Sequence, residues 1–242
     1  MGAKIGLLAF SDGDIAPALG TYAPPDIGAT DALVDRLHPG WTVERVDDST
    51  LLDSSCPADG FVYASVTDGL TVLCGREFMD RPGAYLLGLA GGRLVVQVGM
   101  DSVSDWLSFC LWERGEVVRA VDLWPTGGVT EDVGARLDFE LPFWAGDRRV
   151  TPAVDQLPFH PLDLGEEALR TLCGFTLEGS PGPVDPGEVH LRGYRVTDES
   201  PAGRAAKARE DAELAAVVRA MGPPRRFTLA ADGSLVEIDA EK

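Results

Sequence analysis

The stretch Leu94–Trp124, LVVQVGMDSVSDWLSFCLWERGEVVRAVDLW, decides the fold. It contains three β-rich runs, and Arg114-Gly115 joins the last two in the manner of a tight hairpin. Alternate residues of Trp106–Trp112 form two faces, and both faces are largely apolar. Such a strand is expected near the centre of a sheet that is covered on both sides.

Hairpin signals recur along the chain. Asp68-Gly69 and Asp232-Gly233 each separate two β-rich runs, and Gly favours such turns because it tolerates a positive φ. Helical patterns lie between the hairpins, and further strands are expected at 4–10, 41–46 and 137–141. The sequence therefore predicts an α+β fold: a mixed, mainly antiparallel sheet built from hairpins, with several helices packed on it.

Helix boundaries are indicated by capping residues. Thr30 is expected to cap a helix over 30–37, and Asp163 with Glu166 resembles a capping box at the start of another. The segment 178–187, EGSPGPVDPG, is too rich in Gly and Pro for regular structure. The predicted organisation is an α+β core at 1–178, a connection at 179–200, and a C-terminal helix and hairpin at 201–242 that packs on the core.

Composition limits the functional class. Asp and Glu outnumber Lys and Arg by 39 to 21, giving a net charge of −18. This charge argues against nucleic acid as a partner and favours a basic protein. No apolar run is long enough to span a membrane and no secretory signal is visible, so a cytoplasmic location is expected. The number of subunits is left open.

The cysteines and the missing motifs restrict the chemistry further. Cys74, Cys110 and Cys173 stand in apolar runs, which predicts small buried residues rather than metal ligands. The chain contains no P-loop, no G-x-G-x-x-G and no G-x-S-x-G pattern. No nucleotide cofactor and no catalytic signature are therefore indicated.

Asp12-Gly13-Asp14 is the first candidate site, directly after the opening apolar run. Two carboxylates at this spacing can bind Mg²⁺ through oxygen ligands. The arrangement is similar to that in haloacid-dehalogenase-like phosphohydrolases, but the Ser/Thr, Lys and acidic-pair residues of that family have no clear counterpart. The alternative interpretation is a simple turn after a strand.

Two further candidates lie later in the chain. Asp101 and Asp105 border a polar loop between two apolar runs, where a site or a capped turn is possible. His160, within PFHP, is a candidate general base or metal ligand, or else a core histidine. Acidic residues near the second hairpin suggest a solvated face, a cation site or a contact for a basic partner: Asp122, Glu131, Asp132 and Asp138.

Several segments together resemble a family of uncharacterised actinobacterial proteins. These segments include the opening MGAK, the DGD motif, PFHP at 158–161 and LGEEAL at 164–169. The resemblance extends to about residue 195 and implies no function. An actinobacterial source agrees with the composition, since a chain with three Lys and no Asn is typical of a GC-rich genome.

Two functions follow as hypotheses. The first is a soluble acidic protein that acts by protein binding, as an interaction or immunity-type module. The alternative is a metal-dependent hydrolase that uses Asp12 and Asp14, with help from Asp101, Asp105 or His160 and a divalent cation as its only cofactor. The hydrolase requires these side chains to converge in one cleft.

Overall fold

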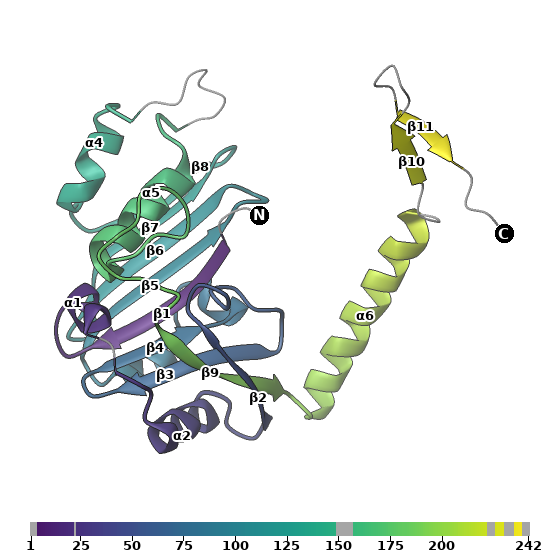
Figure 1. Ribbon diagram of the computed structural model, residues 1–242, viewed down its shortest axis with the longest axis horizontal. Coiled ribbons are helices and arrows are strands. Elements are labelled where there is room, and N and C mark those ends of the chain that lie inside the picture. Colours follow the sequence, from purple (N-terminus) through teal and green to yellow (C-terminus); the bar gives the residue numbers. More distant parts are fainter. Residues whose placement is uncertain (1–3, 22, 149–156, 222–225, 230–234, 239–242) are drawn as a thin grey trace. The chain divides into compact units, whose positions relative to one another are not determined.

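The computed structural model describes residues 4–21, 23–148, 157–221, 226–229 and 235–238. The chain divides into two units, Met1–Thr197 and Asp198–Lys242. A nine-stranded sheet forms the first unit (Figure 1), and every pair of neighbouring strands in it is antiparallel. The predicted α+β fold is confirmed. In spatial order the strands are β2 (Thr42–Thr50), β9 (His190–Thr197), β3 (Phe61–Thr67), β4 (Leu70–Cys74), β1 (Lys4–Ser11), β5 (Leu94–Asp101), β6 (Trp106–Glu113), β7 (Glu116–Trp124) and β8 (Gly128–Val133).

The two predicted hairpins of the first unit form as expected. Arg114 and Gly115 both have positive φ, +53° and +82°, so β6 and β7 are joined by a two-residue turn. β9 lies within the range predicted as a connection, 179–200, and inserts between β2 and β3. Sequence pattern cannot reveal this placement, because β9 reaches its partners only after the chain has folded back over more than a hundred residues.

Helices cover both faces of the sheet. On one face lie α1 (Ile15–Gly20), α4 (Leu141–Trp144), α5 (Pro161–Ala168) and a π-helical turn, Leu169–Cys173. On the other lie α2 (Ile27–Leu37), the short turn Arg76–Phe78 and α3 (Ala84–Ala90). Both faces of β6 are therefore buried, as its two apolar faces predicted. Cys74, Cys110 and Cys173 are buried within these layers, in agreement with the sequence.

A pair of facing glycines brings one segment directly onto the sheet. Gly6 of β1 is paired with Gly99 of β5. A Cβ at Gly6 would lie 2.2 Å from the Gly75 carbonyl oxygen, and a Cβ at Gly99 would lie 2.0 Å from that of Met79. The absence of both side chains lets the segment Gly75–Met79 pack against the strands, and Phe78 enters the core there.

Three local predictions were wrong. α2 begins at Ile27 with Asp26 as its cap, while the Thr30 hydroxyl donates to the Asp26 carbonyl and accepts from the Val66 N–H. α5 begins at Pro161 and is capped by His160 rather than Asp163. Residues 137–141 form no strand, since Asp138–Glu140 is a 3-10 turn that leads into α4.

Glu140 adopts this turn because its carboxylate meets a buried arginine. Arg119 of β7 is fully buried and makes two hydrogen bonds with Glu140, Nε to Oε1 at 2.8 Å and Nη2 to Oε2 at 2.7 Å. Its Nη1 donates to Asp132 Oδ1 at 2.6 Å. Glu140 also accepts from the Leu137 N–H and the Trp144 indole. A buried ion pair is stable only when its hydrogen bonds are complete. Because these bonds link Arg119 of β7 to Glu140 and Glu140 to Trp144 of α4, the network holds α4 on the sheet.

The predicted acidic face near the second hairpin is used internally. Asp122 accepts the indole N–H groups of Trp106 and Trp124, each at 3.0 Å, while Glu131 pairs with Arg81. Burial acts to raise the pKa of Asp132, but the hydrogen bond and charge of Arg119 outweigh it and the pKa is lowered. These carboxylates therefore stabilise the end of the sheet.

The second unit contains α6 (Pro201–Met221) and a hairpin of β10 (Arg226–Leu229) and β11 (Leu235–Ile238). Both elements agree with the sequence, and the predicted turn residues Asp232-Gly233 lie outside the described residues. The packing of 201–242 on the core stays a prediction. Among the described residues, no helix has the length and apolarity needed to cross a membrane.

Candidate functional site

Asp12 and Asp14 follow the last residue of β1, as predicted. β5 runs antiparallel to β1, so that Lys4 stands opposite Asp101 and Ser11 opposite Leu94. Asp12 and Asp101 consequently lie at opposite ends of this strand pair, about 26 Å apart along the strands at about 3.3 Å per residue. The structure therefore does not bring Asp101 to the Asp12–Asp14 pair.

Asp101 is engaged in the turn that follows β5. Its carboxylate lies 3.0 Å from Lys4 Nζ and accepts the Val103 N–H at 2.8 Å. Burial acts to raise the pKa of Asp101, but these two donors outweigh it and the pKa is lowered. The role that these contacts show for Asp101 is to hold the β5–β6 turn.

His160 and Asp105 are brought together at the same end of the sheet as Asp101. His160 Nδ1 accepts the Leu162 N–H at 3.3 Å, and Nε2 lies 3.7 Å from Asp105 Oδ1. Asp105 has φ of +52°. Since His160 already caps α5, its ring is committed to the helix start. The five sequence candidates therefore do not form one centre, and no group of three potential metal ligands occurs among the described residues.

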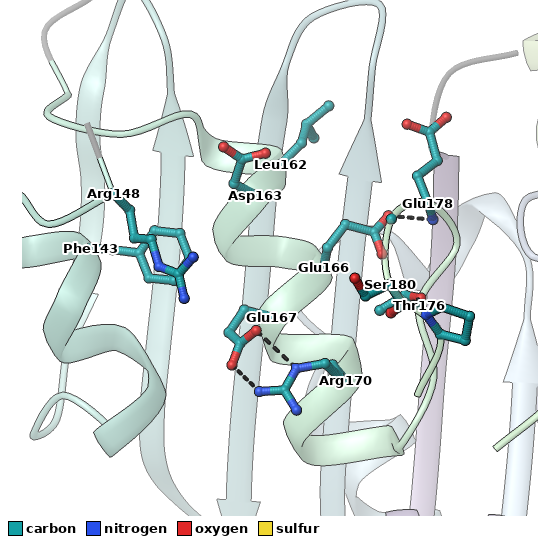
Figure 2. Close-up of a pocket in the computed structure, with 12 residues that line it drawn as sticks. Phe143, Arg148, Leu162, Asp163, Glu166, Glu167, Arg170, Thr176, Glu178 and Ser180 are labelled. Atoms are coloured by element: carbon teal, nitrogen blue, oxygen red, sulfur yellow. Dashed lines mark hydrogen bonds and ion pairs between the residues drawn. The ribbon is translucent and has the colours of Figure 1, made fainter. Parts of the chain in front are cut away.

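A pocket that the sequence analysis missed lies beside α5 (Figure 2), and we call it the α5 pocket. Its volume is about 960 Å³. One wall is α5 and the π-helical turn, a second is the loop 176–181, and Phe143 of α4 and Arg148 complete it. The charged residues that line it are Arg148, Asp163, Glu166, Glu167, Arg170 and Glu178.

Glu166 holds the loop wall of the α5 pocket in place. Its carboxylate accepts the Leu177 N–H at 2.9 Å and the Glu178 N–H at 3.2 Å. The second of these hydrogen bonds is drawn in Figure 2. Burial raises the pKa of Glu166, and the two N–H donors offset this effect only in part. Because the bridge is made within the protein itself, the pocket is formed before any ligand enters.

The remaining charges divide into paired and unpaired groups. Arg170 and Glu167 form a two-pronged ion pair along one side of the helix (Figure 2). Asp163 and Glu178 have no ion pair within the described part of the chain, and both are exposed. The pocket therefore presents two carboxylates without an ion-pair partner. Arg148, whose guanidinium carbon lies 5.9 Å from the centre of the Phe143 ring, adds one positive charge to the same lining.

The sequence did contain a signal for this pocket. Asp163, Glu166 and Glu167 are spaced i, i+3, i+4, which places them on one face of a helix. The capping-box pattern at Asp163 and Glu166 assigns the same carboxylates to the helix start, so it points to a helix end rather than to a pocket. The opposite wall could not be predicted, since it depends on the path of the loop after Gly174.

The fold and the pocket define an α+β protein with a two-sided antiparallel sheet and an acidic pocket on one helix layer. A family model described as a family of unknown function (DUF6928) matches residues 5–194. The chain belongs to this family, which confirms its membership of an uncharacterised family. No curated protein and no solved structure matches the chain.

Proposed function

We propose that this protein acts by binding a basic protein partner, and that the α5 pocket receives a Lys or Arg side chain of that partner. The observation that carries the proposal is the pair of unpaired carboxylates, Asp163 and Glu178, at a preformed pocket of about 960 Å³. A cationic side chain would gain charge-assisted hydrogen bonds there. Leu162, which is partly exposed in the lining, offers a contact for its aliphatic stem.

The overall charge supports the same proposal. A net charge of −18 attracts a basic partner over a distance of about one Debye length and speeds its association. The same charge opposes a polyanion in this role. The proposal further places the protein in the cytoplasm of an actinobacterium, supported by four free thiols and by a Lys-poor, Asn-free composition.

Selection from a displayed library of random peptides tests the proposal. Peptides selected by the wild-type protein should be enriched in Lys and Arg, and raising the salt concentration from about 50 mM to about 500 mM should weaken their binding at least about tenfold. The double variant Asp163→Asn/Glu178→Gln should lose the enrichment.

A matched control separates the pocket from the general charge. Asp35→Asn/Glu188→Gln removes the same number of negative charges from exposed positions that do not line the pocket, and it should select the same basic peptides as the wild type. Enrichment of uncharged peptides, or equal loss in both double variants, would refute a site at α5.

A further inference from the structure

At the end of β1 that carries Asp12, two adjoining hollows form a cleft, which we call the Asp14 cleft. The polar hollow has a volume of about 370 Å³ and the apolar hollow about 390 Å³. Asp14, Leu94 and Glu113 line both hollows, so the two adjoin. Each volume lies in the range of small-molecule sites, about 300–1,000 Å³.

The apolar hollow has a preformed hydrophobic floor. Ile15 and Val96 are each 1% exposed and Leu111 is 7% exposed. Leu94 of β5 and Leu172 of the π-helical turn add half-buried apolar surface. Since the floor is built by strands and by two short helical segments of the core, its shape is set by the fold rather than by a loop. It suits an aliphatic or aromatic group.

The polar hollow carries charges of both signs. Asp12, Asp14 and Glu113 contribute carboxylates, and Arg93 and Arg114 contribute guanidinium groups. None of these five side chains forms an ion pair with another described residue of the structure. Arg93 donates from Nε to the Ala90 carbonyl at 2.9 Å, which orients its guanidinium group beside the cleft.

Arg114 occupies a conformation that its residue type disfavours. Its φ is +53°, in the left-handed region where Gly and Asn are the usual residues of a two-residue hairpin. The fold nevertheless places an arginine in the lining of the polar hollow, although Asn would suit the turn better. Residues in unfavourable conformations are concentrated at functional sites.

We infer that the Asp14 cleft binds a free α-amino acid with a large apolar side chain. Arg93 and Arg114 offer planar donors for the carboxylate, while Asp14 and Glu113 accept from the ammonium group. The side chain enters the apolar hollow. This site is separate from the α5 pocket in its lining residues, and the inference does not depend on the proposed partner binding.

Isothermal titration calorimetry of the full chain tests the inference with L-leucine, L-phenylalanine and two fragments of leucine. The fragment 3-methylbutylamine lacks the carboxylate, and 4-methylpentanoate lacks the ammonium group. Leucine or phenylalanine should bind saturably, and each leucine fragment should bind at least about tenfold more weakly than leucine. Glycine, which lacks the apolar group, should show no saturable binding.

Three variants locate the binding. Arg114→Asn should weaken amino-acid binding about tenfold while the melting temperature stays equal or rises, because Asn favours the turn. A structural role alone cannot produce both effects. Thr171→Trp, at an exposed position that lines the apolar hollow, should block binding. Asp163→Asn, in the α5 pocket, should bind as the wild type does.

Three results would overturn the inference. One is no saturable binding of leucine or phenylalanine at about 10 mM, ten times a dissociation constant of about 1 mM. The second is equal binding of leucine and either of its fragments, because the charge pair would then have no role. The third is unchanged affinity in Arg114→Asn together with unchanged affinity in Thr171→Trp, which would place the amino acid elsewhere on the protein.

Discussion

Replacing Glu140 with Gln removes one charge of the buried ion pair and keeps the volume of the side chain. The carboxylate accepts four hydrogen bonds: two from Arg119, one from the Leu137 N–H at 2.9 Å and one from the Trp144 indole at 3.2 Å. Gln offers one oxygen and one amide NH₂ group. At the amide end the NH₂ group faces existing donors, so two of the four bonds are lost.

The expected cost is about 3 kcal/mol of unfolding free energy. Removing one partner of a buried ion pair typically costs about 3–5 kcal/mol, because the other charge stays buried without compensation. Arg119 keeps Asp132 at 2.6 Å, and the Val133 carbonyl at 2.9 Å, which places the cost at the lower end of that range. In urea this loss corresponds to a midpoint about 1 M lower if the slope is about 3 kcal/mol/M.

Equilibrium urea unfolding, followed by tryptophan fluorescence, measures this cost. The control is Glu167→Gln, which breaks a two-pronged Arg–Glu pair of similar geometry on the surface, at Arg170. It should change the unfolding free energy by no more than about 0.5 kcal/mol. The double variant Arg119→Met/Glu140→Leu should be more stable than either of its single variants. A loss below about 1 kcal/mol in Glu140→Gln, or an equal loss in the control, would refute the reasoning.

Three further predictions concern packing, pH and thiol access. Gly99→Ala should destabilise the fold by at least about 2 kcal/mol, because the added Cβ would lie 2.0 Å from the Met79 carbonyl oxygen. Gly88→Ala, at an open helical position, should be neutral or stabilising. The melting temperatures of the two variants measure this difference. Burial and the hydrogen bond to Asp31 raise the pKa of Tyr194 from 10.0 to about 12. The stability that Tyr194 contributes is therefore complete below pH 10.0 and is lost as the pH rises through about 12. A tyrosinate absorbance titration should show this step, and Tyr194→Phe should lack it. Ellman's reagent should modify Cys56 alone in the folded protein and all four thiols after unfolding. Burial raises the pKa of Cys173 to about 12, and Cys74 and Cys110 are also buried. Reaction of a second thiol in the folded protein would contradict the buried placement.

Local pattern was enough to predict the hairpins and the class of fold. The alternation in β6 and the two-residue link at Arg114-Gly115 depend on neighbours within a few positions, so the chain carries that information without its tertiary structure. The same holds for the three buried cysteines, because a small apolar residue inside an apolar run is buried wherever the run packs. The capping prediction at Asp163 failed because Pro161 permits the helix to begin earlier, behind His160.

Tertiary structure alone decided which candidate residues meet. Asp12 follows β1 and Asp101 is the last residue of β5, but antiparallel pairing of these strands places the two at opposite ends of the sheet. The pairing of β1 with β5 and of β5 with β6 brings Asp14, Glu113 and Arg114 to one cleft, and the chain path after Gly174 closes the α5 pocket. The local pattern around Glu140 predicts a strand. The residue lies instead in a buried turn, because its carboxylate forms an ion pair with Arg119. Contacts between distant segments depend on strand order and direction, and these are set by the packing of the whole chain rather than by any local pattern.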